Sequence, residues 1–210
     1  MTKRTGMTRR FMLTAGARAL MIGPLTQAAS ALPRAVTPAS NTGLPLVEAS
    51  TQSKKPKSKY WRKKVRLETD EKPGTIIVDT KAKHLYFVLD NGRAVRYGIG
   101  VGREGFTWSG TARIAYKREW PTWTPPAAMI KRQPELAKYR GGMKPGLTNP
   151  LGARAMYLYN KGGDTGYRLH GSPEWWSIGH NVSSGCIRLM NQDVIDLYNR
   201  AEPGAKVIVM

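Results

Sequence analysis

Short runs of β-branched and aromatic residues, separated by turn residues, dominate the chain after residue 74. Runs of this length and composition are typical of strands. The pattern predicts strands at 75–79, 84–89, 93–101, 111–116, 155–159, 167–170 and 206–210. Asp90-Asn91-Gly92 separates two of these runs, and Asn-Gly in that position is a strong signal for a tight hairpin turn.

Helical signals are few and short. Asn191 can cap a helix over 192–200, and prolines lead two short candidate helices at 126–132 and 134–140. The many prolines of 120–150 exclude a long helix there. We therefore expect a mainly β domain, sandwich-like or barrel-like, with a few short helices.

The first 31 residues are typical of an export signal and not of the fold. Arg9-Arg10 precedes a weakly apolar stretch at 11–25, and Ala29-Ser30-Ala31 offers a small-residue cleavage site. Paired arginines before such a stretch resemble a twin-arginine signal; a poor Sec signal and a basic tail are the alternatives. We expect an exported, periplasmic protein. No uncharged apolar stretch long enough for an integral membrane span follows this segment.

Residues 32–73 are predicted to be a linker before a single domain at 74–210. The linker is first rich in Pro and Ser, and 54–66 then holds eight basic residues within thirteen positions. This basic tract has two interpretations: a tether to anionic wall polymer or to a membrane surface, or a solvated charged linker.

Strong positive charge belongs to the mature protein as well as to the leader. The formal net charge is +20, and removing a leader with five basic and no acidic residues leaves +15. Such an excess implies an anionic partner. Nucleic acid would fit the charge, but export removes that partner, so we expect no nucleic-acid binding.

The chain has one cysteine, Cys186, and therefore no intrachain disulfide. Together with the three histidines it shows no zinc-ligand spacing, and no nucleotide or flavin motif is present, so we expect neither metal nor cofactor. A buried apolar cysteine is the ordinary interpretation. In an exported protein a lone thiol needs a reason, and catalysis is one.

The residues around Cys186 favour catalysis. Ser183-Ser184-Gly185 precedes Cys186 and predicts a tight turn, where backbone N–H groups can converge on a developing oxyanion. His170 ends a predicted strand sixteen positions earlier and could take the thiol proton. Arg188 offers a fork for a substrate carboxylate, or alternatively an internal salt bridge.

His170-Gly171, followed after a fixed interval by Ser-Ser-Gly-Cys-Ile-Arg-Leu-x-Asn-x-Asp, resembles the signature of the YkuD-type L,D-transpeptidase family. The resemblance extends over about 74–210. It implies the family's β fold, Cys186 as nucleophile and His170 as general base, oriented by a carbonyl near Gly171. The N–H groups of Gly185 and Cys186 would hold the oxyanion. Asn191 and Asp193 match the motif, and we interpret them as helix-cap and turn supports.

The resemblance implies acyl transfer from the third residue of a peptidoglycan tetrapeptide stem to an amine, with release of D-Ala, and sensitivity to carbapenems.

The sequence departs from the family at Ser184, which stands where many members have His. Trp175 and Trp176 could form a wall over the cleft and bind substrate, whereas Trp108, Trp120 and Trp123 are interpreted as core. Water or a protein lysine as acceptor would instead give a hydrolase or a wall–protein ligase, and a silent wall-binding module is a further alternative.

Overall fold

The computed structural model describes residues 55–104 and 108–210. The predicted export signal at 1–31 and the predicted linker as far as residue 54 lie outside the described residues. Within the described ranges, no helix is long and apolar enough to cross a bilayer.

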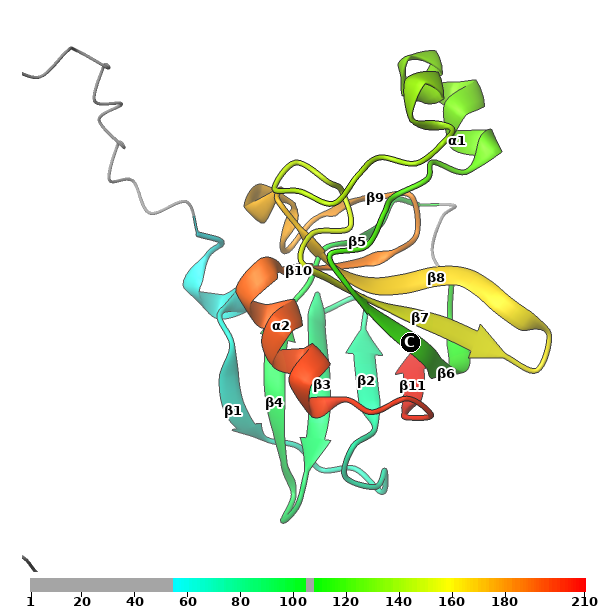
Figure 1. Ribbon diagram of the computed structural model, residues 1–210. Helices are drawn as coiled ribbons and strands as arrows, with labels where there is room; N and C mark the ends of the chain where they lie inside the picture. Colours follow the sequence, from blue (N-terminus) through cyan, green and yellow to red (C-terminus); the bar gives the residue numbers. More distant parts are fainter. Residues whose placement is uncertain (1–54, 105–107) are drawn as a thin grey trace, which may run out of the picture. The chain divides into compact units, whose positions relative to one another are not determined.

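One large mixed sheet dominates the part of the chain that the structure describes (Figure 1). Its strand order is β1-β4-β3-β2-β11-β6-β7-β8-β10, and β5 and β9 form a separate parallel pair. The strands are β1 (Lys63–Arg66), β2 (Ile76–Asp79), β3 (His84–Leu89), β4 (Arg93–Gly98), β5 (Val101–Gly102), β6 (Gly110–Glu119), β7 (Arg154–Asn160), β8 (Gly163–Ser172), β9 (Asn181–Ser183), β10 (Ile187–Met190) and β11 (Lys206–Val209).

The helices are short. They are η1 (Ser58–Tyr60), α1 (Ala127–Arg132), η2 (Pro134–Tyr139), η3 (Trp175–Ser177) and α2 (Asn191–Arg200). Figure 1 shows α2 beside the sheet and α1 on an excursion away from it. The expectation of a mainly β fold with a few short helices is confirmed.

The large sheet folds over on itself. β7 and β8 cross above β2, β3 and β4 (Figure 1). The edge of β10 then meets the chain just beyond β4, where the Gly100 N–H donates to the Arg188 carbonyl at 2.9 Å and the Arg188 N–H donates back at 2.8 Å. These two bonds hold β10 against the chain beyond β4, and the parallel ladder holds it against β8, so the strand that follows Cys186 is fixed on both sides.

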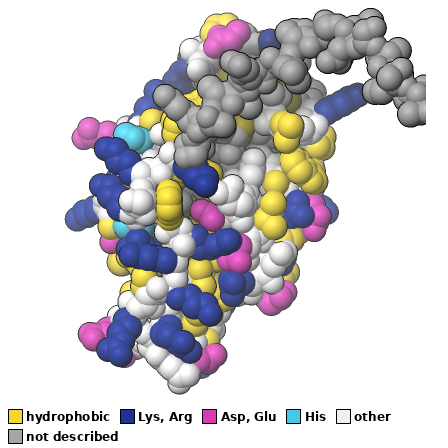
Figure 2. Space-filling view, turned by 90° about the vertical axis from the view of Figure 1, so that its left-hand side faces the viewer, with side chains coloured by type: hydrophobic (Ala, Val, Ile, Leu, Met, Phe, Trp, Pro, Cys, Tyr) yellow, Lys and Arg dark blue, Asp and Glu magenta, His cyan; other side chains and the backbone are white. Residues whose placement is uncertain are grey.

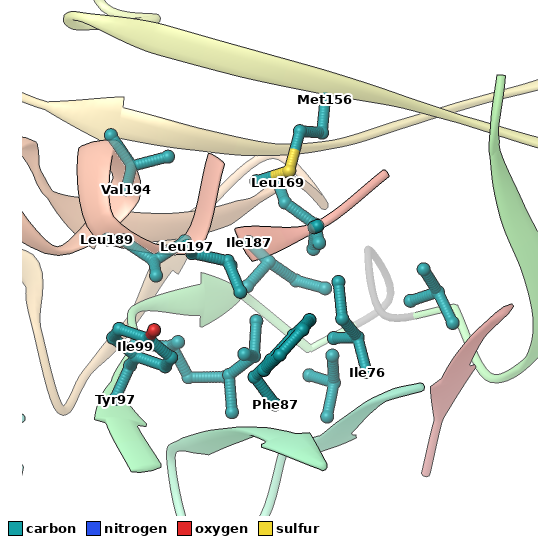
Figure 3. Close-up of a cluster of buried hydrophobic side chains, with 14 of the residues drawn as sticks. Ile76, Phe87, Tyr97, Ile99, Met156, Leu169, Ile187, Leu189, Val194 and Leu197 are labelled. Atoms are coloured by element: carbon teal, nitrogen blue, oxygen red, sulfur yellow. The ribbon is translucent and has the colours of Figure 1, made fainter. Parts of the chain in front are cut away.

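The hydrophobic core fills the space between the crossed halves of the sheet. Figure 3 shows Met156 and Leu169 from the upper strands facing Phe87 and Ile76 from the lower ones. Leu197 of α2 closes the side of this cluster, and it is fully buried. Burying one such side chain contributes roughly 1.5–3 kcal/mol. The core therefore holds β8 and β10 rigidly from below.

The hairpin between β3 and β4 follows the sequence prediction. Three residues, 90–92, connect the strands, and Asn91 and Gly92 among them have φ values of 59° and 62°, the left-handed conformation that these two residue types adopt readily. The resulting register pairs Leu89 with Arg93 and His84 with Gly98. The turn therefore fixes which side chains of these strands enter the core.

The segment at 58–66, predicted as linker, is folded instead. β1 pairs antiparallel with β4, and Tyr60 is buried with its backbone against Gly98 and its ring against Gly179. A Cβ atom at Gly179 would lie 2.2 Å from that ring, so only glycine leaves room for it. Arg62 also approaches Asp196 at 3.4 Å. These contacts, distant in sequence, order a stretch whose composition indicates a linker.

Asn191 does not cap α2, contrary to the sequence prediction. The helix begins at Asn191 itself, and no side-chain bond caps its first turn. The Asn191 Oδ1 atom instead accepts the N–H of Ala153 at 2.9 Å, and it sits against the backbone of Gly152 and Gly171. The residue therefore joins the loop before β7 to β8, where its side chain supports the end of the strand that carries His170.

Candidate functional site

The neighbouring strands β8 and β10 bring His170 and Cys186 together. They run parallel, with Ile187 opposite Leu169 and Arg188 opposite His170. Leu169 and Ile187 point into the core. Cys186 comes one residue before β10, and because side chains alternate along an extended chain we infer that it lies on the opposite face, which His170 shares. His170 is offset from Cys186 by two residues along the strand direction and lies on the neighbouring strand. Ordinary strand spacings then put the two Cα atoms roughly 8 Å apart.

The loop before β10 sets the position of Cys186. Gly185 has φ +122°, a conformation that favours glycine. The Ser183 hydroxyl donates to the Cys186 carbonyl at 2.6 Å and accepts the Gly185 N–H at 3.2 Å. The Gly185 N–H therefore has a partner inside the loop, whereas we expected it to face an oxyanion. Ser184 is exposed.

His170 is held in one orientation. Its side chain is buried, and Nδ1 lies 2.5 Å from the carbonyl oxygen of Gly171, a carbonyl of the kind that we expected to orient the ring. Since a carbonyl only accepts, Nδ1 carries the hydrogen and Nε2 keeps its lone pair. A Cβ atom at Gly171 would lie 2.3 Å from Asn191 Oδ1, so glycine is needed here for packing.

The thiol and the imidazole are both neutral at rest. Burial lowers the pKa of His170 to about 4, although its hydrogen bond to the backbone of Gly171 acts in the other direction. Burial likewise raises the pKa of the Cys186 thiol, and the backbone and charge of Arg168 and the charge of Arg188 oppose this. The arrangement supports proton transfer from thiol to imidazole during attack, and not a preformed ion pair.

Arg188 forms an internal ion pair. Its guanidinium bonds the carboxylate of Glu174, and only 19% of its side chain is exposed. This is the structural role that we weighed against substrate binding. The same ion pair ties β10 to η3, which carries Trp175 and Trp176 in an edge-to-face pair. Trp176 is 58% exposed, so this pair lies at the surface near Arg188 and not in the core.

The other singled-out residues lie elsewhere or serve the framework. Asp193 is buried on α2, and burial raises the pKa of its carboxyl to about 6 while the charge of Arg62 opposes the shift. Trp108 stacks on Tyr167 and packs against the core. Trp120 is 41% exposed, so its prediction as a core residue is wrong.

Sequence reasoning missed an ion pair whose two charges act on the thiol. Arg168 of β8 donates to both carboxylate oxygens of Asp164 at 2.7 Å each. Only the spacing of four residues between opposite charges hints at this pair in the sequence, and that spacing has meaning in helices rather than strands.

The buried neutral imidazole predicts a pH-dependent stability. Its folded pKa of about 4 is below the ordinary 6.5, so the unfolded chain binds the proton more readily between these values. The stabilisation is present above pH 6.5 and is lost as the pH falls toward 4, a change on the order of 3 kcal/mol.

Urea unfolding of wild type and His170→Gln at several pH values measures this loss of unfolding free energy. Asp193, with its raised pKa, contributes the opposite slope to both proteins, so the difference between them isolates His170. If the unfolding free energies of wild type and His170→Gln depended equally on pH, the loss of stability could not be assigned to His170.

A family model described as the L,D-transpeptidase catalytic domain matches residues 73–209. The protein described as "Probable L,D-transpeptidase YcfS" from Escherichia coli is 35% identical over 140 residues, which cover 64% of this chain and 43% of that protein. "Probable L,D-transpeptidase YbiS" from the same organism is 30% identical over 145 residues, with the same coverage. The chain therefore spans less than half the length of these curated relatives.

Two solved structures share the fold. One, described as a probable carnitine operon oxidoreductase from Brucella melitensis, is 45% identical, with a TM-score of 0.51 over 72% of this chain and 94% of that chain. The other is the Ldtfm-avibactam carbamoyl enzyme, which is 19% identical, with a TM-score of 0.50 over 67% of this chain and 49% of that chain. The activity named for each belongs to that protein. The matched residues 73–209 include both His170 and Cys186.

Proposed function

Because the chain belongs to the L,D-transpeptidase catalytic domain family, we propose that it transfers the acyl group of a peptidoglycan stem peptide through Cys186. The donor is a tetrapeptide stem, cleaved after its third residue with release of D-Ala. The acceptor is an amine of a second stem. The observation that supports the proposal is the pairing of β8 with β10, which brings the strand that carries His170, buried and oriented by the backbone, alongside the strand that directly follows the half-buried Cys186.

In the first step the Cys186 sulfur attacks the carbonyl carbon of the third stem residue. His170 Nε2 accepts the thiol proton, and the imidazolium then gives this proton to the departing amine of D-Ala. The carbon–nitrogen bond breaks and a thioester forms. The carbonyl of Gly171 favours the protonated ring and therefore lowers the cost of this transient charge. We assign the developing oxyanion to the Cys186 N–H, since the Gly185 N–H bonds Ser183.

In the second step an acceptor amine attacks the thioester. Neutral His170 takes a proton from the amine, the new amide forms, and the Cys186 thiol is restored with that proton. The net reaction exchanges one amide bond for another and needs neither an oxidant nor energy from a nucleotide. A strained β-lactam such as a carbapenem would acylate the same sulfur.

Muropeptides decide between this reaction and its alternatives. The mature protein is incubated with disaccharide-tetrapeptide and the products are read by mass spectrometry. A dimer formed with loss of D-Ala supports transpeptidation. Tripeptide and free D-Ala without a dimer would make the protein a hydrolase, and unchanged substrate would point to a protein lysine as acceptor or to a silent binding module.

We also propose that the protein works in the periplasm, at an anionic lipid surface. The predicted signal supports export. Figure 2 looks onto the side that carries β1, where many Lys and Arg side chains lie over the left and lower parts of the visible face, with some Asp and Glu among them. Lys63, Lys64 and Arg66 of β1 are exposed, and Trp61, half exposed beside them, is a side chain that favours membrane interfaces.

Neutralising β1 is expected to weaken binding to phosphatidylglycerol vesicles at least tenfold, since each cation near such a surface contributes about 1 kcal/mol. The variant carries Lys63→Gln, Lys64→Gln and Arg66→Gln. A control with equal charge loss carries Lys131→Gln, Lys138→Gln and Lys144→Gln, which are exposed on and after the α1–η2 excursion. Co-sedimentation at physiological salt compares the two. Equal losses of binding in the two variants would reduce the effect to net charge and contradict a dedicated role for β1.

A further inference from the structure

A bulge interrupts β8 beside the thiol. The register with β7 pairs Tyr157 with Arg168, and then Tyr159 with Asp164. Three residues of β8, 165–167, therefore oppose the single residue Leu158. Bulges of this kind occur next to active sites, where they redirect backbone and side-chain groups.

Side chains within the bulge hold its shape. The Thr165 hydroxyl donates to the Leu158 carbonyl at 2.6 Å and accepts the Tyr167 N–H at 3.1 Å. Asp164 Oδ1 accepts the N–H of Gly166 at 2.9 Å, and Gly166 has φ +76°, which favours glycine. The Leu158 carbonyl and the N–H groups of Gly166 and Tyr167 therefore have local side-chain partners in place of the β7–β8 ladder.

Arg168 closes the bulge as a clamp. Its two terminal nitrogens bond the two oxygens of Asp164 at 2.7 Å, a bidentate geometry that lysine cannot reproduce. The guanidinium also lies 4.4 Å from the centre of the Tyr157 ring, which itself stacks on Tyr116 at 4.2 Å. Only 16% of the Arg168 side chain is exposed, so its position is fixed and its charge is weakly screened.

The thiol rests on this bulge. The Cys186 sulfur lies 3.9 Å from the carbonyl oxygen of Gly166, at the distance of a weak sulfur hydrogen bond. Cys186 comes one residue before β10, whose register on β8 begins with Ile187 opposite Leu169, and both the backbone and the charge of Arg168 act on the pKa of the thiol. The clamp therefore fixes the backbone that the sulfur contacts and sets a guanidinium near it.

We propose that the Asp164–Arg168 pair is a positioning element for Cys186. It holds the bulge on which the sulfur rests, and it supplies positive charge that favours the thiolate in a buried place. The charged groups that act on the thiol are Arg168 and Asp164 from β8 and Arg188 from β10, whose charge is balanced by Glu174. Removing Arg168 thus leaves Asp164 as an uncompensated negative charge beside the sulfur.

Alkylation by iodoacetamide tests the electrostatic part, and it needs no substrate. Cys186 is the only cysteine, so the gain in intact mass reports one site. Arg168→Met is expected to raise the midpoint of the rate–pH curve by about one unit, and to slow alkylation about five- to tenfold at neutral pH. Arg168→Lys keeps the charge and is expected to keep most of the rate, which also guards against a Met variant that fails to fold.

A matched control lies on α2, where Arg200 makes the same two-bond contact to Asp196 four residues earlier, at 2.8 and 3.0 Å. Arg200→Met is expected to leave the thiol midpoint unchanged. An unshifted midpoint in Arg168→Met, or an equal shift in Arg200→Met, would overturn the proposal.

The turnover part rests on the proposed function. Arg168→Lys is expected to lower kcat with muropeptide while KM changes little, because the charge remains and the fixed geometry is lost. Wild-type turnover that is preserved in Arg168→Lys would overturn the positioning role. If the wild type itself shows no turnover, the proposed function fails. The alkylation rates still test the effect of Arg168 on the thiol, because they need no substrate.

Discussion

Replacing Cys186 with alanine is expected to abolish muropeptide turnover, with kcat falling at least about 10⁴-fold. No other cysteine exists to replace the nucleophile. The fold should survive, because the side chain is partly exposed and its sulfur makes only backbone contacts, a weak hydrogen bond to the Gly166 carbonyl at 3.9 Å and one with the backbone of Arg168. A change in unfolding free energy within about 1 kcal/mol is expected. Product formation and urea unfolding are measured on the same preparation.

Cys186→Ser is the companion variant for this test. A hydroxyl is far harder to deprotonate than a thiol, so it should keep the shape of the site and lose nearly all activity. If Cys186→Ala released D-Ala at a rate near that of the wild type, Cys186 would not be the nucleophile. If both variants lost activity only because they unfolded, the denaturation curves would reveal it.

Replacing His170 with glutamine is expected to lower kcat by about 10³-fold, within the range for loss of a general base. Glutamine can still donate to the Gly171 carbonyl, so the variant removes proton transfer while keeping one hydrogen bond of the site. KM should change little, since the imidazole acts mainly on the transition state.

His180→Gln is the control for that loss, because His180 is exposed and lies in the loop after η3. It should retain wild-type kcat. An equal loss in both variants, or an unchanged kcat in His170→Gln, would remove His170 from the role of base.

Local sequence pattern predicted the elements whose shape depends on neighbouring residues. The hairpin turn at Asn91-Gly92 follows from two residues that adopt positive φ readily. The strands β10 and β1 could not be predicted from local sequence pattern. β1 has an exposed, basic sequence, and it is ordered by Tyr60 lying against Gly98 and Gly179, which are far away in the chain.

The same distinction holds for the candidate site. The motif indicated Cys186 and His170, and the register of β8 with β10 places them on one face. The bulge clamp at Asp164–Arg168 was not predicted, because it depends on how β8 pairs with β7. Asn191 was interpreted as a cap since its residue type favours that position, yet the nearby N–H of Ala153 is its partner.

Intact-protein mass spectrometry after a rapid acid quench tests the central claim most directly. The mature protein is mixed with disaccharide-tetrapeptide, and the intact mass of the quenched protein is measured. Peptide mapping then locates the modified residue. We predict a transient mass increase equal to the disaccharide-tripeptide acyl group, located on Cys186 and absent from Cys186→Ala. Product formation without any such adduct on wild type, or an adduct on another residue, would contradict acyl transfer through this thiol.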